Sequence, residues 1–298
     1  MDGWERVPLL ATAQVATDER LFLGEGPTWD PVRERLLWVD IMAGVVHTGR
    51  LRDDGSIAPA ERIALPDTAG AVAVAADGAL VVAGTHRLHY VAPDGAISSG
   101  RELVAGAGRR FNDGKPDPAG RFVVGTLGPG GELLLRMDAD AGEPVTVIDD
   151  DLTLSNGLAW SADGRRFYSV DTGTARIFVR DYDPVSGEVG ERTVFAVLDH
   201  GHPDGLTVDA DDHVWVAVWG GGCVLRFSPY GALVGRVDVP APHTTCPVFA
   251  GPGLDTLVIT TATEHLTPAQ LAEHPLSGRV FTARTGVRGI PPLLWGGR

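Results

Sequence analysis

The chain has 298 residues, of which 44% are hydrophobic and 21% are charged, with 39 glycines, 21 prolines and a formal net charge of −14. This composition is typical of a globular protein rich in turns, and no stretch is apolar enough to span a bilayer. The negative charge argues against nucleic acid or an anionic membrane as partner, because both attract basic surfaces. We therefore expect a soluble protein that binds neither.

The amino-terminal residues and the cysteines bear on the cellular compartment. Residues 1–6 lack the basic start, apolar stretch and cleavage site of a secretory signal. Cys223 and Cys246 are too few for a disulfide framework, and their spacing matches no zinc motif. These features together predict a cytoplasmic protein.

One pattern returns six times along the chain: a small polar or acidic residue, a glycine, a short apolar run, a turn and a second apolar run. The glycines at positions 26, 70, 114, 157 and 205 lie about 44 residues apart, and a degraded sixth copy surrounds Cys246. A period of about 40–50 residues made of short strands indicates a β-propeller. We expect residues 1–298 to form one all-β domain, a six-bladed propeller with four antiparallel strands in each blade.

The strand pattern is clearest in the second, fourth and fifth repeats. The second repeat predicts strands at 72–75, 79–83 and 88–91. The fourth predicts strands at 158–160, 166–170, 175–182 and 191–197, and the fifth at 206–208, 213–218, 224–227 and 233–239. A single short helix is expected at 267–274, with Thr267 as its N-cap and Pro268 at its first position.

The two ends of the repeat array are complementary. The sixth repeat lacks an outer strand, and residues 9–16 precede the first repeat without a partner of their own. An open ring would leave two sheet edges unpaired, which propellers avoid. We therefore expect residues 9–16 to complete the last blade and close the ring.

The residue before each glycine gives the repeat a functional meaning. Equivalent positions of successive blades lie on a ring around one axis, so Glu25, Asn156 and Asp204 should converge on the channel. Their oxygen donors suit Ca²⁺, Mg²⁺ or Mn²⁺ better than a structural zinc, although a site with several waters also accepts Zn²⁺. A cation would also compensate two carboxylates brought together. The alternative interpretation is that these residues only cap the ends of strands.

Four segments in this order resemble the SMP-30/gluconolactonase/regucalcin family. They read LGEGPTWD at 23–30, RFNDGK at 110–115, LSNGLAWS at 154–161 and PDGL at 203–206. The resemblance covers essentially the whole chain. It implies a six-bladed propeller that carries one divalent metal ion in its channel and hydrolyses sugar lactones or related esters.

The resemblance also assigns roles to individual residues. It implies that Glu25, Asn156 and Asp204 hold the metal ion. Arg110 and Asn112 match positions that hydrogen-bond the substrate, and Asp204 matches the carboxylate that also activates water. Ca²⁺ is the favoured ion, with Zn²⁺, Mn²⁺ and Mg²⁺ as alternatives.

The expected function is hydrolysis of a small-molecule sugar lactone to its aldonic acid, with the metal as Lewis acid for the carbonyl and for water. The alternatives are another ester or phosphotriester hydrolase on the same scaffold, and a calcium-binding regulatory protein without catalysis. The particular lactone, its ring size and the physiological metal stay open. Both a monomer and an oligomer are compatible with the sequence.

Two further residues are candidates for contact with the substrate. Relatives carry a substrate-contacting glutamate in a longer loop of the third blade, whereas this chain has a compact loop at 125–131 followed by Glu132. His202 is expected at the mouth of the pocket, and Trp219, at a strand end, either packs between blades or stacks on sugar. We interpret the other notable histidines as surface or structural residues; they lie at positions 86, 89, 200, 243 and 265.

Overall fold

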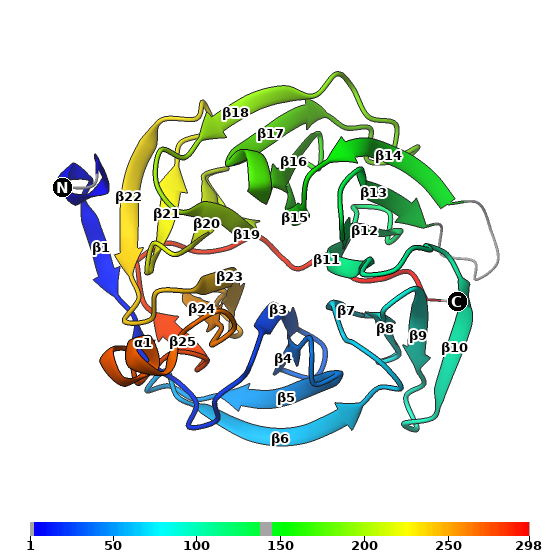
Figure 1. The fold of residues 1–298 in the computed structure, drawn as a ribbon, viewed down its shortest axis with the longest axis horizontal. Coiled ribbons are helices and arrows are strands. Elements are labelled where there is room, and N and C mark those ends of the chain that lie inside the picture. The colour runs from blue at the N-terminus through cyan, green and yellow to red at the C-terminus, as the bar shows by residue number, and fades with distance from the viewer. Residues whose placement is uncertain (1–2, 138–144, 298) are drawn as a thin grey trace.

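The computed structural model describes residues 3–137 and 145–297. Within them, six sheets are arranged as a ring around a central axis (Figure 1). Five sheets have four strands and one has five, and the strands of each repeat run antiparallel from the axis outward. The predicted six-bladed propeller is therefore confirmed.

The blades follow the chain in order, and the first strand of each repeat is innermost. The first blade contains β3 (Gly24–Asp30), β4 (Arg35–Asp40), β5 (Val45–Leu51) and β6 (Ile57–Ala64). The second contains β7 (Ala71–Val74), β8 (Leu80–Ala83), β9 (Arg87–Val91) and β10 (Ile97–Glu102). The third contains β11 (Arg110–Pro116), β12 (Phe122–Leu127), β13 (Glu132–Met137) and β14 (Val145–Leu152).

The other three blades follow the same plan. The fourth contains β15 (Ser155–Trp160), β16 (Arg166–Asp171), β17 (Arg176–Asp181) and β18 (Thr193–Val197). The fifth contains β19 (His202–Val208), β20 (Val214–Trp219), β21 (Cys223–Phe227) and β22 (Leu233–Asp238). The sixth takes β23 (Thr244–Ala250), β24 (Thr256–Thr261) and β25 (Phe281–Ala283) from the last repeat.

The amino-terminal segment closes the ring, although not entirely as predicted. Strand β2 (Gln14–Val15) pairs antiparallel with β25 and is the outer strand of the sixth blade, as expected. Strand β1 (Leu9–Thr12) instead pairs in parallel with β22 and adds a fifth strand to the fifth blade. The prediction for residues 9–16 is therefore right for β2 and wrong for β1. The physical reason is that β22 also has an open edge, and β1 satisfies its backbone groups.

Helical structure is limited to short pieces among the described residues: η1 (Gly3–Arg6), η2 (Thr172–Thr174) and α1 (Pro268–Glu273). The predicted helix is confirmed in α1, where Thr267 and Gln270 form a reciprocal capping box and a proline occupies the first turn. None of these helices is long and apolar enough to cross a membrane.

The repeated glycine lets neighbouring inner strands approach closely. A Cβ atom on Gly157 would lie 2.4 Å from the carbonyl oxygen of Asp204 in the next blade, and one on Gly205 would lie 2.3 Å from Sγ of Cys246. Both distances are shorter than any normal contact, so only glycine fits. The glycine of the repeat therefore has a packing role between blades.

Five of the six inner strands also carry a break in pairing register at this place. The shifts lie between Glu25 and Thr28, Phe111 and Gly114, Asn156 and Leu158, Pro203 and Leu206, and Thr244 and Cys246. A bulge of this kind redirects a side chain locally without ending the strand. The same break in the repeat thus turns the polar residues toward the axis.

The carboxyl-terminal segment 284–297 crosses the rear of the ring, where Figure 1 shows it in red behind the blades. The N–H group of Ala210 in the fifth blade donates to the carbonyl of Arg288 (2.9 Å). Farther along, the N–H group of Trp295 donates to the carbonyl of Val74 in the second blade (2.9 Å). The segment therefore spans the ring from one side to the other.

Candidate active site

A cavity of about 290 Å³ opens at the front of the ring, at the beginning of the inner strands. The five predicted site residues all line it: Glu25, Arg110, Asn112, Asn156 and Asp204. They come from the first, third, fourth and fifth blades, so the ring brings together residues that are far apart in sequence. The volume lies near the lower end for ligand pockets, which suits a monosaccharide-sized molecule.

Glu25 lies at the bulge of β3 and is almost fully buried, with 6% of its surface exposed. Its Oε2 accepts a hydrogen bond from the N–H group of Gly26 (3.0 Å). Burial, followed by the negative charge of Asp113, raises the pKa of Glu25 from 4.5 to about 8. The ionised form of Glu25 is therefore unfavourable unless a positive charge lies beside it.

Asp204 and Asn156 meet across the boundary between the fifth and fourth blades. The amide Nδ2 of Asn156 donates to Oδ1 of Asp204 and also to the hydroxyl of Thr172 (3.2 Å). Burial, followed by the charges of Glu25 and Asp113, raises the pKa of Asp204 well above its usual range. The buried Oδ1 of Asn156 accepts no hydrogen bond from the described residues. This oxygen is thus an unused acceptor that points to a missing partner.

A third carboxyl group, Asp113, is buried beside this pair, and the sequence analysis did not assign it to the site. Its Oδ1 accepts a hydrogen bond from the N–H group of Gly114 (2.8 Å), whereas its buried Oδ2 has no partner among the described residues. Burial raises the pKa of Asp113. Asp113 precedes a glycine of the repeat, as Glu25 and Asp204 do, so its position in the repeat was the available signal.

Two positive side chains act on these carboxyl groups. Arg110 donates from Nη1 to the carbonyl of Phe111 (2.9 Å) and to Oδ1 of Asn112 (2.7 Å). Lys115, the only lysine in the sequence, donates from Nζ to the carbonyl of Leu206 (2.6 Å). Its charge favours the ionised forms of Asp113 and Glu25. Asn112 is fixed in turn, because its Nδ2 donates to a backbone carbonyl of the fourth blade (3.1 Å).

The arrangement fits a divalent cation of the hard, oxygen-binding kind. The three buried carboxyl groups are opposed by two cations, which leaves negative charge in the channel, and the free Oδ1 of Asn156 adds a neutral oxygen donor. No group of three or more His, Cys, Asp or Glu side chains within the described residues forms a ready-made metal cluster. The donor set is instead mixed, with an asparagine amide that contacts Asp204 directly.

His202 and Glu132, the two further candidates for substrate contact, lie in different places relative to the cavity. His202 lines the cavity, as expected, and its Nδ1 lies 3.3 Å from the carbonyl of Thr172. Glu132 does not line it: the side chain is fully buried and accepts hydrogen bonds from Thr126 (2.7 Å) and from Nε of Arg109 (3.2 Å). Glu132 thus stabilises its own blade, and no acidic residue of the third-blade loop faces the pocket.

Two residues around the mouth were missed or misread, and the role of a third, Trp219, had been left open. Glu264 and His265, in the loop after β24, line the cavity together with Trp219. The ring of Trp219 stacks on His243, with centroids 4.0 Å apart. His265 was interpreted as a surface or structural residue, and Glu264 was not considered. Their loop lies outside the repeated pattern, so no spacing in the sequence pointed to them.

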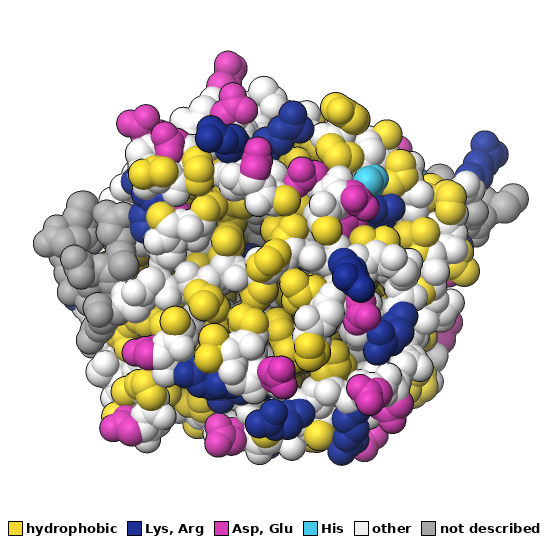
Figure 2. Space-filling model, turned by 180° about the vertical axis from the view of Figure 1, so that it is seen from behind, with side chains coloured by type: hydrophobic (Ala, Val, Ile, Leu, Met, Phe, Trp, Pro, Cys, Tyr) yellow, Lys and Arg dark blue, Asp and Glu magenta, His cyan; other side chains and the backbone are white. Residues whose placement is uncertain are grey.

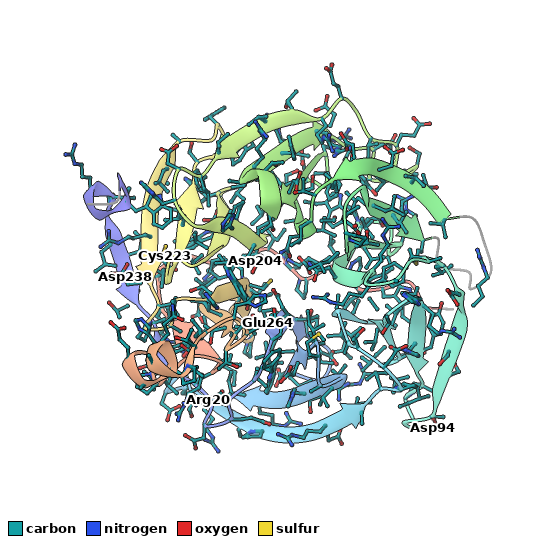
Figure 3. The ribbon with its side chains drawn as sticks, in the orientation of Figure 1. Arg20, Asp94, Asp204, Cys223, Asp238 and Glu264 are labelled. Atoms are coloured by element: carbon teal, nitrogen blue, oxygen red, sulfur yellow. The ribbon has the colours of Figure 1, made fainter. Side chains whose placement is uncertain are left out.

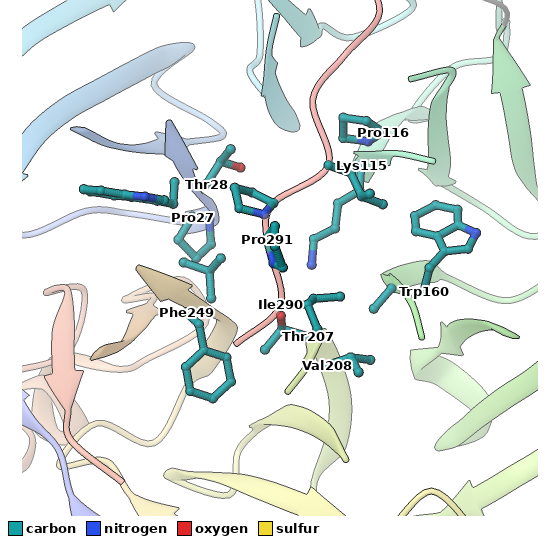
Figure 4. A pocket seen from close by; sticks show the side chains of 15 residues that line it. Pro27, Thr28, Lys115, Pro116, Trp160, Thr207, Val208, Phe249, Ile290 and Pro291 are labelled. Atoms are coloured by element: carbon teal, nitrogen blue, oxygen red, sulfur yellow. The ribbon is translucent and has the colours of Figure 1, made fainter. Parts of the chain in front are cut away.

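A second cavity, of about 90 Å³, lies at the rear end of the same inner strands (Figure 4). Its walls are mainly apolar and aromatic, including Trp29, Trp160 and Phe249, with Lys115 as the charged member. Residues 290–293 of the carboxyl-terminal segment cover it. Viewed from behind, hydrophobic side chains gather near the middle of this face (Figure 2). The rear mouth is therefore unlike the acidic front mouth.

Comparison with known proteins agrees with this geometry. A family model described as SMP-30/Gluconolactonase/LRE-like region matches residues 23–263. The chain is 36% identical to the 6-deoxy-6-sulfogluconolactonase of Pseudomonas putida, over 92% of this chain and 95% of that protein. It is 35% identical to the pentonolactonase of Haloferax volcanii, over 84% and 85%. A regucalcin from Agrobacterium tumefaciens, described as calcium-binding, has a structure with a TM-score of 0.87 at 31% identity, over 97% and 98%.

Proposed function

The chain belongs to the SMP-30/gluconolactonase/LRE-like family and is a carboxylic ester hydrolase, and we propose that it opens sugar lactones to aldonic acids in a metal-dependent reaction. One observation carries this proposal: buried carboxyl groups, a free amide oxygen and an arginine from four blades face one small cavity. The lactonase relatives support a small-molecule sugar lactone as substrate. One continuous ring of blades supports a single domain over residues 1–298.

We assign the metal to Glu25, Asn156 and Asp204, whose carboxyl and amide oxygens suit Ca²⁺, with Zn²⁺, Mn²⁺ and Mg²⁺ as alternatives. When bound there, a divalent ion supplies Lewis-acid polarisation of a carbonyl oxygen and of water. The rest of the chemistry belongs to the chain's own side chains.

Asp204 is the proposed general base. Burial and neighbouring negative charge raise the pKa of Asp204 in the metal-free protein, and a bound cation would lower it again, so that the ionised carboxylate can accept a proton. It takes the proton of the attacking water as the oxygen bonds to the lactone carbonyl carbon. Its hydrogen bond from Nδ2 of Asn156 fixes the orientation of the carboxylate during this transfer.

Arg110 and Asn112 hold the substrate on the third-blade side of the cavity. The guanidinium of Arg110 is positioned by two acceptors, so its remaining N–H groups are free to donate to hydroxyls and to the carbonyl oxygen as negative charge develops. Collapse of the tetrahedral carbon breaks the ring C–O bond. The ring oxygen takes the proton held by Asp204 and becomes a hydroxyl, and the new carboxylic acid releases its proton to solvent to leave the carboxylate product.

A substrate panel tests this function. Protein stripped with chelator and reloaded in turn with Ca²⁺, Mg²⁺, Mn²⁺ or Zn²⁺ is given five- and six-carbon aldonolactones, phenyl acetate and a phosphotriester, with acid release as the readout. We expect turnover of aldonolactones, dependent on the added metal, to exceed turnover of the other two classes. Faster hydrolysis of the phosphotriester or of phenyl acetate would assign a different ester class to this scaffold.

The panel also distinguishes an enzyme from a calcium-binding regulator without catalysis. The similarity to regucalcins makes this second function the alternative to test. A regulator would bind Ca²⁺ in calorimetry and hydrolyse none of the esters. The open cavity beside the acidic cluster favours the enzyme, because a purely structural ion needs no adjoining space for substrate.

A further inference from the structure

Glu264 is an acidic residue at the front cavity to which the mechanism gives no role. It follows β24 in the sixth blade and lines the cavity, and Figure 3 shows it near the centre of the ring, close to Asp204. In a ring of six blades, the sixth blade lies opposite the third, which carries Arg110. The two side chains therefore approach a bound molecule from opposite sides.

The backbone of Glu264 is held in place from two directions. Its N–H group donates to the carbonyl of Phe22 (3.0 Å), and its carbonyl oxygen lies 2.9 Å from Nδ1 of His243. His243 is itself stacked on Trp219. The loop thus fixes the backbone from which the carboxylate projects, which limits the entropy lost when a ligand binds.

The carboxylate of Glu264 is free to accept hydrogen bonds. It accepts none from the described residues, and the nearby ring of His265 has its Nε2 3.8 Å from Oε2 of Glu264. The side chain is 22% exposed, so it is largely withdrawn from water while its acceptors stay open toward the cavity.

Arg110 provides the matching donors. Only its Nη1 is engaged by described residues, which leaves Nε and Nη2 without protein acceptors, and no described carboxylate lies within ion-pair distance of it. Burial lowers the pKa of the Arg110 guanidinium, and Glu264 is the foremost of the negative charges that oppose this shift. A donor and an acceptor without protein partners thus line the same cavity, which protein atoms do not fill.

We propose that Glu264 is a substrate-binding residue that accepts hydrogen bonds from ring hydroxyls, opposite Arg110, and so selects polyhydroxylated lactones over unsubstituted ones. This deepens the proposed function, on which it rests. A sugar hydroxyl both donates and accepts, so adjacent hydroxyls can donate to the carboxylate of Glu264 and accept from Arg110. An unsubstituted lactone would leave both charged groups unpaired in a partly desolvated site, which weakens its binding.

Kinetics with matched lactones test the proposal. Glu264→Ala is compared with wild type and with Glu273→Ala, an exposed change on the nearby helix α1. Substrates are glucono-δ-lactone and δ-valerolactone, which share the ring but not the hydroxyls. We expect Glu264→Ala to raise KM for the sugar lactone about ten- to hundredfold with kcat nearly unchanged, whereas kcat/KM for δ-valerolactone should stay the same or rise, because the variant leaves no carboxylate unpaired beside this substrate. Glu264→Gln should fall between, because its amide still accepts.

A binding measurement separates this inference from the proposed function. Calorimetry with 1,5-anhydroglucitol, a ring polyol that has no carbonyl to hydrolyse, should show binding to wild type and to Glu273→Ala but about tenfold weaker binding to Glu264→Ala. If no lactone were hydrolysed but the polyol still bound more weakly to Glu264→Ala than to wild type, the proposed hydrolase function would be wrong and the polyol-binding role of Glu264 would stand. An unchanged ratio of kcat/KM between the two lactones, or equal polyol binding by wild type and Glu264→Ala, would overturn the role of Glu264.

Discussion

The two mouths of the channel are built from the two ends of the same inner strands, yet they differ in almost every physical respect. The front mouth collects buried carboxyl groups and an arginine around a cavity of about 290 Å³. The rear mouth is apolar, encloses about 90 Å³ and is covered by the chain's own carboxyl-terminal segment. The front lies at the bulges in the strands, whereas the rear follows regular pairing.

The two mouths differ in how their buried carboxyl groups are paired. At the rear, the buried Asp209 is compensated by Nε1 of Trp215 (2.9 Å) and by Nη2 of Arg226 (2.7 Å). At the front, Glu25 and Asp204 have raised pKa values and no ion pair with a described residue. Uncompensated buried charge is a feature of functional sites more than of structural ones.

Asp204→Ala has the largest expected effect. We expect kcat/KM for an aldonolactone to fall at least about a thousandfold, because the proposed base and a metal ligand are lost together. Calorimetric affinity for Ca²⁺ should fall as well, while the Tm of the metal-free protein stays the same or rises, since one repelling carboxyl group is gone. Retained turnover by metal-loaded Asp204→Ala would refute the proposed role.

Asp209→Ala should have the opposite profile. Removing this carboxylate leaves Arg226 and the indole of Trp215 without their buried acceptor, which costs about 3 kcal/mol and lowers Tm by about 6–12 °C. At 25 °C, kcat/KM should match wild type, because the residue lies at the rear end of β19. Thermal scans and lactone kinetics on the same preparation check both statements; lost activity with unchanged Tm would contradict the division between the mouths.

The pH dependence of stability should report mainly the buried carboxyl groups of the front mouth, opposed by His47 and His243, whose pKa values burial lowers. With the pKa of Glu25 raised from 4.5 to about 8, the folded metal-free protein binds more protons than the unfolded chain between these values. Its stability must therefore fall as pH rises from 5 to 8. We expect Tm in chelator to be higher at pH 5 than at pH 8, and Ca²⁺ to raise Tm more at pH 8. A metal-free Tm that climbs over this interval would be inconsistent with these buried carboxyl groups.

Lys115 lies between the two mouths. Its substitution has the smallest expected effect of the four. Its side chain lines the rear cavity while its charge acts on Asp113 and Glu25. Lys115→Met keeps the length of the side chain and removes the charge, so Ca²⁺ should bind about fivefold more tightly, about 1 kcal/mol, because a competing cation is gone. The metal-free Tm should fall by a few degrees. Weaker Ca²⁺ binding in calorimetry would show that Lys115 does not oppose the metal.

The repeat explains how much could be predicted from sequence. Equivalent positions in a propeller share one geometry, so the polar residue before each glycine placed Glu25, Asn156 and Asp204 together without any structure. The same rule, applied to the third repeat, would have included Asp113. Period and turn chemistry likewise predicted the strands of the blades and helix α1.

What the sequence could not predict lies outside the period. Glu264 belongs to an irregular loop whose conformation depends on contacts with Phe22 and His243, which are distant in sequence. The carboxyl-terminal cover contains consecutive prolines, has no strand periodicity and is held by isolated backbone bonds to other blades. Strand β1 had two open edges available, and only three-dimensional packing decides which one it joins.

The pairing of β1 with β22 and of β2 with β25 also determines when the ring can close during synthesis. Both strands are synthesised more than two hundred residues before their partners β22 and β25. They have no strand to pair with until those partners are made, so ring closure joins segments that are synthesised far apart in time. Ring completion is therefore a long-range event, slow by the standards of local hairpins, and a nascent chain stalled before β25 presents an unsealed edge.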